Sequence, residues 1–143
     1  MEIKLSTDLK SPIYQDALNI RYKVFVDEQD VPENMEIDEY EDISTYFVGY
    51  IDDQPVVTAR CFPTDDNGWH VQRVATYKEY RKRGLAKELL EYIEQVAKQE
   101  DYDYLILGAQ DQAQGFYLKL GYQVIGDQYM DAGIEHHDMK KSL

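Results

Sequence analysis

The sequence predicts a single α/β domain over residues 1–143, with a mixed sheet of about seven strands and helices on both faces. Two observations predict this class. Apolar residues alternate in some segments and recur at helical spacing in others, in the order β-α-β-β-β-α-β-α-β-β. The length allows one core of ordinary size, and a hydrophobic share of 43% is too high for a disordered chain.

The first half of the chain predicts one helix between strands. A short strand is expected at residues 2–6. Ser11 followed by Pro12 predicts a helix start, because serine caps free amides and proline fits the first helical position, and the helix should run to about Val26. Residues 44–51, 56–62 and 69–76 alternate as strands, and turn residues at 52–55 and 63–68 make them sequential and antiparallel.

The second half predicts two helices and three strands. A helix opens at Gly84, with one apolar face made of Leu85, Leu89, Leu90, Ile93, Val96 and Ala97. Residues 104–107 form a short apolar strand. Asp111 is expected to cap a further helix that ends at Gly121, with an inner face of Ala113, Phe116, Tyr117 and Leu120. Strands at 122–129 and 134–140 follow, joined by a turn at Asp131, Ala132 and Gly133.

Six of the 15 basic residues gather where the strand 69–76 meets the helix from Gly84; they are Arg73, Lys78, Arg81, Lys82, Arg83 and Lys87. Cations destabilise a helix start, because the helix dipole is positive there and its first amides are free. Gly84 and Ala86 are small enough to let a ligand approach those amides. The pattern predicts a phosphate cradle, and the alternative is a solvated basic turn.

Residues 27–42 hold nine carboxylates, and no Lys or Arg occurs between Lys23 and Arg60. We expect a solvated loop or broken helix here. The functional alternative is a wall of a substrate cleft that attracts a protonated amine. Glu28 stands out because it lies where the first helix should end, a common place for a site residue.

Charge and composition exclude some classes of partner. The net charge of −13 argues against nucleic acid, whose phosphates would be repelled. No apolar run is long enough for a membrane span, and no signal peptide is expected. The single cysteine, Cys61, lies in a strand pattern and is expected to be a buried apolar residue. Because one cysteine cannot form an internal disulfide, we expect a cytoplasmic protein. No metal is expected, because His136 and His137 are adjacent in a strand and point to opposite faces.

Two segments resemble motifs of the GCN5-related N-acetyltransferase (GNAT) superfamily. Residues 81–86, Arg-Lys-Arg-Gly-Leu-Ala, resemble its acyl-CoA-binding signature R/Q-x-x-G-x-G/A. About thirty residues later, 113–122 resemble its A-x-x-F-Y-x-K-x-G-F/Y segment. Three further segments resemble stretches found in a bacterial subgroup of uncharacterised acetyltransferases; they are residues 25–29, 38–40 and 132–136. The resemblance covers the whole chain.

The resemblance implies acetyl transfer from acetyl-CoA to a primary amine, with a splay between the fourth and fifth strands that holds the pantetheine arm. Cofactor contacts are expected from Val74, Ala75, Thr76, Arg81, Lys82, Arg83, Gly84, Leu85, Ala86, Lys87, Gln110 and Phe116. Val74 and Thr76 would bind the arm through their backbone, and an amide of Val74 or Ala75 would bind the oxyanion. Gln110 replaces an Asn that contacts pantetheine in many members. Tyr117 would protonate the leaving thiolate.

The strand 69–76 lacks the Glu that many members of the superfamily use as the general base. An alkylamine has a pKa of ~10.4 and must lose a proton before attack. Glu28, acting through water, is the first candidate. The expected acceptor is a small cationic or amino-acid-like amine, and the protein is expected to be a monomer or homodimer. An acyl-CoA sensor without turnover and a protein or peptide N-acetyltransferase are the alternatives.

Overall fold

Seven strands form one mixed sheet in the order β1-β2-β3-β4-β5-β7-β6, in a computed structural model that describes residues 1–143. β4 and β5 run parallel, and the other neighbouring strands are antiparallel. The predicted fold class and order are confirmed. The strands are β1 (Glu2–Ser6), β2 (Thr45–Ile51), β3 (Gln54–Pro63), β4 (Gly68–Thr76), β5 (Tyr104–Gln110), β6 (Gln123–Asp131) and β7 (Ile134–Ser142). The α-helices are α1 (Pro12–Arg21), α2 (Glu33–Glu36), α3 (Leu85–Gln99) and α4 (Gln114–Lys119).

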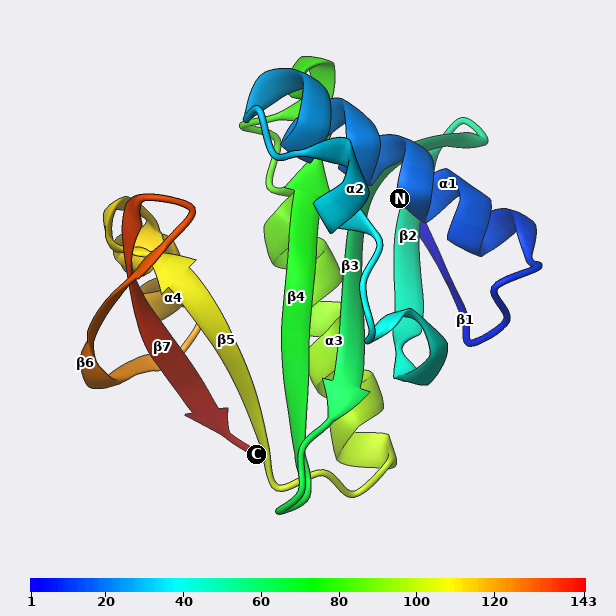
Figure 1. Cartoon of the computed structure of the whole chain (residues 1–143). Helices are drawn as coiled ribbons and strands as arrows, with labels where there is room; N and C mark the ends of the chain where they lie inside the picture. The colour runs from blue at the N-terminus through cyan, green and yellow to red at the C-terminus, as the bar shows by residue number, and fades with distance from the viewer.

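Helices cover both faces of the sheet, with α1 in front and α3 behind in Figure 1. On one side, Leu89, Leu90 and Ile93 of α3 are buried against Val71 of β4 and Leu107 of β5. On the other, α1 is buried against β2. Successive strand residues point to opposite faces, so these two cores define an α3 face and an α1 face along every strand.

The first helix begins as predicted, and helical structure continues to Glu28, close to the predicted end near Val26. Ser11 caps it, because the amide of Tyr14 donates to Ser11 Oγ at 3.1 Å. At Tyr22 the α-helix widens into a π-helical segment, Tyr22–Glu28. Such segments are rare and often occur at functional sites. The candidate Glu28 is therefore the last helical residue of this element.

The hairpin turns follow the predicted turn chemistry. Asp52 and Asp53 join β2 to β3 with φ values of +50° and +64°. Ala132 and Gly133 join β6 to β7 with φ values of +52° and +76°. Two successive residues with positive φ are typical of the turns whose twist matches paired strands. No helix combines the length and apolar character that crossing a lipid bilayer requires.

The predicted splay between β4 and β5 is present. Their pairing is confined to Gly68–His70 of β4 and Tyr104–Ile106 of β5. Beyond these residues β4 continues to Thr76 and β5 to Gln110 without pairing to each other. Figure 1 shows the two strands diverging from their common lower end. The backbone edges that face each other above that point are free for another extended chain.

Candidate active site

β4 carries a bulge where it leaves β5. Opposite β3, Gln72 pairs with Arg60 and Ala75 with Thr58, so two residues of β4 oppose one of β3. Arg73 has a φ of +55°, in the left-handed region. A bulge of this kind turns backbone groups out of the ladder. The residues predicted to bind cofactor through their backbone, Val74, Ala75 and Thr76, all lie on this segment of β4.

The basic turn connects β4 to α3. Gly84 has a φ of +75°, and a Cβ added to it would meet no atom within 4 Å, so the turn is open on that side. No side chain caps the first turn of α3. Free amides at a helix start, a positive dipole and open space suit a diphosphate. The structure brings together here the predicted set Arg81, Lys82, Arg83, Gly84, Leu85, Ala86 and Lys87.

The predicted base touches the predicted cradle. Glu28 Oε2 lies 2.8 Å from Nη2 of Arg81, and Nε of Arg81 donates to the carbonyl of Thr76 at 3.0 Å. Arg81 therefore links the end of β4 to the π-helical segment. Because the carboxylate of Glu28 is held in this ion pair, it is directed at the cradle.

Tyr117 and Phe116 differ in burial although they are neighbours. Tyr117 is half-buried against the α3-face core, and burial alone raises the pKa of its phenol to about 12. Phe116 is 39% exposed, so its expected place on the inner face of the helix is wrong. A 3₁₀ turn, Asp111–Ala113, precedes the six residues of α4. Its tighter winding shifts which side chains face inward.

Gln110 ends β5, and its Oε1 accepts from the side chain of Gln112 at 2.8 Å. The next residue, Asp111, does not cap a helix as expected. Its Oδ1 lies 2.7 Å from Nδ1 of His137 and accepts from the Gln114 amide at 3.1 Å. The hydrogen bond from His137 lowers the pKa of Asp111. Asp111 therefore fixes side chains of β7 and α4 rather than a helix start.

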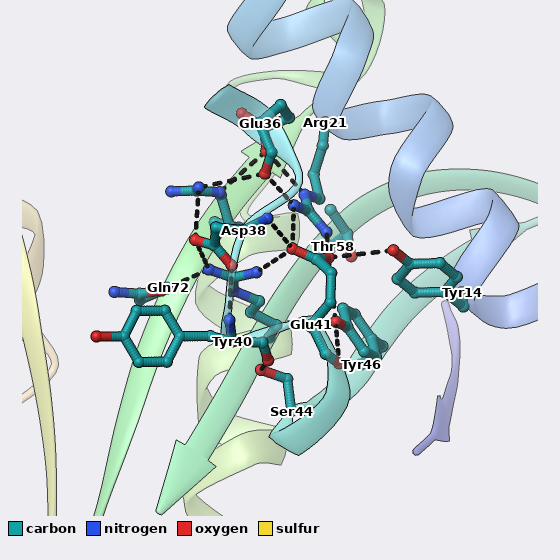
Figure 2. Close-up of polar contacts among 12 residues, drawn as sticks. Tyr14, Arg21, Glu36, Asp38, Tyr40, Glu41, Ser44, Tyr46, Thr58 and Gln72 are labelled. Carbon is teal, nitrogen blue, oxygen red and sulfur yellow. Dashed lines mark hydrogen bonds and ion pairs between the residues drawn. The ribbon is translucent and has the colours of Figure 1, made fainter. Parts of the chain in front are cut away.

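A network of three arginines and three carboxylates lies on the α1 face and joins the acidic stretch to β3 and β4 (Figure 2). Glu41 Oε1 lies 2.7 Å from Nη1 of Arg21, and its Oε2 lies 2.8 Å from Nη1 of Arg60. Asp38 Oδ2 lies 2.7 Å from Arg60 and 3.1 Å from Arg73. Glu36 Oε2 lies 2.8 Å from Arg21 Nε. It is also 2.9 Å from Nε of Arg73, although that N–H is not directed at the oxygen.

The network overturns the expected solvated loop for the middle of 27–42. Glu36 is 1% exposed and Glu41 is 5% exposed. Burial by itself raises the pKa of Glu41, but hydrogen bonds from Arg21 and the charges of Arg21 and Arg60 outweigh it and lower the pKa to about 2. Each of these carboxylates is neutralised by the protein's own arginines. They are therefore not a free negative wall for a cationic substrate.

Sequence reasoning missed this network, although a signal was present. Arg60 stands in the middle of the strand pattern Val56–Phe62, and Arg21 follows the apolar positions Ala17 and Leu18 of α1. Arginines on core-facing positions need carboxylate partners, since burying an unpaired charge is costly. The acidic stretch was the obvious source of such partners.

The chain matches one family model and is similar to several known proteins. The family model described as the acetyltransferase (GNAT) domain matches residues 10–143. From Bacillus subtilis, the "Uncharacterized N-acetyltransferase YjcF" is 38% identical over 128 residues, which cover 89% of this chain and 91% of that protein. The "Uncharacterized protein YyaT" of the same organism is 36% identical over 131 residues, 90% of this chain and 88% of that protein.

Solved structures share the fold over almost the whole chain. A crystal structure from Lactobacillus plantarum, described as a candidate N-acetyltransferase, is 32% identical with a TM-score of 0.92, covering 99% of this chain and 97% of that one. An aminoglycoside 6′-N-acetyltransferase complexed with coenzyme A has a TM-score of 0.79 at 16% identity, covering 99% of this chain and 97% of that one. The latter likeness shows the fold alone.

Proposed function

Because this chain belongs to the GNAT acetyltransferase family, and so is an acyl-CoA-dependent acyltransferase, we propose that it acetylates the primary amine of a small cationic or amino-acid-like acceptor. The amine attacks the thioester directly, with both substrates bound at once. The observation that carries the proposal is the end of β4–β5 pairing at His70 and Ile106, after which unpaired β4 leads to the basic turn. An open backbone edge beside an anion cradle suits a long chain that ends in a diphosphate.

The residues around the gap fit acetyl-CoA, which supplies an acetyl thioester open to nucleophiles. Val74 and Thr76 would bind the extended arm by backbone hydrogen bonds, and Ala75 or Val74 would offer an amide to the oxyanion. The cations and free amides from Arg81 to Lys87 would hold the diphosphate. Gln110 and Phe116 would contact the arm from the side of β5 and α4.

Tyr117 is assigned to the leaving sulfur. Its pKa of about 12 means that the phenol is protonated at neutral pH and can donate a hydrogen bond. A thiol has a pKa of ~8.5, so a phenol with the higher value keeps its proton against a thiolate. The contribution of Tyr117 is therefore a donated hydrogen bond that stabilises charge developing on sulfur, and complete proton transfer is secondary.

Glu28 stays the candidate base from the sequence. To act on an amine, its carboxylate would have to leave the 2.8 Å ion pair with Arg81. A diphosphate bound at the cradle competes for Arg81 and would favour that release. Glu28 would then work through water, as expected for a carboxylate at the end of a helical segment.

The test is acetyl-CoA turnover over a panel of small amines, read as release of free thiol. Transfer to alkylamines above the rate without acceptor supports the proposal. Binding of acetyl-CoA without transfer to any amine would instead support the acyl-CoA sensor. Peptides with a free N-terminus or a lysine belong in the same panel, and their selective acetylation would support the protein N-acetyltransferase.

A further inference from the structure

A pair of polar side chains lies over β5 just past the point where it leaves β4. Leu107 and Ala109 are buried in the α3-face core, so Gly108 between them faces the α1 side. A Cβ on Gly108 would lie 2.3 Å from Oη of Tyr129 and 3.6 Å from Oδ1 of Asp138. The phenol and the carboxylate thus occupy the place of the missing side chain. A larger residue at position 108 would displace the hydroxyl of Tyr129 from this place.

Asp138 differs from the other carboxylates near the gap. Oη of Tyr129 donates to Asp138 Oδ1 at 2.7 Å, and Asp138 forms no ion pair. By contrast, the carboxylates Glu28, Glu36, Asp38 and Glu41 are each held by one or more arginines. Asp138 is half-buried and keeps an oxygen that no protein group binds.

The charged and titratable neighbours of Asp138 do not neutralise it. His70 lies on the same face at the last paired position of β4, and burial lowers its pKa although Asp138 acts in the opposite direction. Burial, and then the hydrogen bond to Asp138, raise the pKa of Tyr129. Lys140 Nζ lies 4.1 Å from the centre of the Tyr104 ring, and His136 Nδ1 is 2.7 Å from the carbonyl of Ile134. None of these groups forms an ion pair with Asp138, so its second oxygen stays open to a ligand.

We propose that Asp138, oriented by Tyr129, binds the ammonium group of the acceptor on the α1 face of the gap and takes its proton before attack. This rests on the proposed amine acetylation and names its substrate as a cationic alkylamine. An ammonium bound to the second carboxylate oxygen of Asp138 would lie on the β5 side of the gap, across from the bulge of β4. Unlike Glu28, Asp138 reaches this role without leaving an ion pair.

The step balances in protons and electrons. The ammonium gives one proton to Asp138, and the nitrogen lone pair then forms the C–N bond to the thioester carbon. The C–S bond breaks, sulfur leaves with its electron pair and becomes a thiol by taking one proton. The second N–H proton and, later, the proton on Asp138 go to solvent, and solvent supplies the one that sulfur takes, so each turnover releases one proton overall. Asp138 returns to its carboxylate form when its own proton passes on.

The experiment compares Asp138→Asn with Glu28→Gln, and uses Asp131→Asn on the exposed edge strand β6 as a matched loss of charge. Each is assayed with an alkylamine, protonated at neutral pH, and with an aromatic amine, which is neutral there. Asp138→Asn should lower kcat/KM for the alkylamine by roughly a hundredfold, a typical size for a lost general base. The aromatic amine and acetyl-CoA binding should change little. Tyr129→Phe should shift the alkylamine-to-arylamine ratio in the same direction by less.

The outcomes separate this proposal from the proposed function. If the alkylamine-to-arylamine ratio of kcat/KM is the same in Asp138→Asn as in Asp131→Asn, the role of Asp138 is overturned. If only Glu28→Gln loses activity specifically with the alkylamine, the role of base belongs to Glu28. If the wild type acetylates no amine, the proposed function fails. The ammonium site is then decided by calorimetry of 1,4-diaminobutane binding to the protein with free CoA. Binding lost in Asp138→Asn supports the site, and no binding to the wild type overturns it.

Discussion

The substitution Glu41→Gln should destabilise the protein in a way that depends on pH. Glu41 has a pKa of about 2 in the folded protein against an ordinary value of 4.5. Its ionised form is therefore favoured by folding, and the stabilisation is present above pH 4.5 and lost as the pH falls toward 2. A shift of this size corresponds to about 3 kcal/mol, of which about 2 kcal/mol is already lost at pH 3. Little solvent screening applies, because Glu41 is buried.

Urea unfolding of the wild type and of Glu41→Gln between pH 7 and pH 3 measures this pH-dependent stabilisation. The glutamine variant leaves the buried Arg21 and Arg60 short of a counter-charge, which costs about 3 kcal/mol or more at neutral pH. The difference in unfolding free energy between the two proteins should shrink as the pH falls, since protonated Glu41 resembles glutamine. Glu39→Gln, at an exposed position of the same stretch, is the control. A difference that stays constant with pH, or one no larger than that of Glu39→Gln, would refute the reasoning.

Three further substitutions test the cofactor side of the site. Tyr117→Phe should lower kcat roughly tenfold, which corresponds to the loss of one hydrogen bond to a charged group, and should retain acetyl-CoA affinity. Unchanged turnover would remove Tyr117 from the mechanism. Gly84→Glu should abolish acetyl-CoA binding, measured by calorimetry, because its side chain is bulky and repels the phosphates. Gln99→Glu, at the far end of α3, should bind acetyl-CoA normally. Retained binding in Gly84→Glu would show that the diphosphate does not bind at this turn. Arg81→Gln should weaken acetyl-CoA binding and free Glu28, and wild-type affinity in this variant would exclude Arg81 as a phosphate ligand.

The fold was predictable because its signals are local. The cap at Ser11, the apolar stripe of α3 and the turn at Ala132 and Gly133 each depend on residues close in sequence, and the structure confirms all three. The splay between β4 and β5 was predicted from the resemblance to the family motifs. Phe116 was misplaced because a 3₁₀ turn before α4 changes the helical phase, and such a turn leaves no mark in residue periodicity.

The pairing of charges was not predictable from the sequence. Glu36 and Arg73, in contact here, are 37 residues apart in the chain, and Asp138 meets Tyr129 across a hairpin with an irregular register. Net charge gives the same value whether a carboxylate is free or held by an arginine. The acidic stretch was therefore interpreted by its composition, whereas its role depends on which side chains the sheet brings beneath it.

The arginine network and the opening of β4 are parts of one arrangement. Arg73 adopts a left-handed conformation that costs a residue with a side chain of order 1 kcal/mol, and such strain persists only where surrounding contacts hold it. Here Glu36 and Asp38 hold its guanidinium. The same residue forms the bulge beside Val74, whose backbone is proposed to meet the cofactor. In the proposed mechanism the acidic stretch therefore acts through the shape of β4, and the negative charge offered to an acceptor would come from Asp138, on the opposite side of the gap.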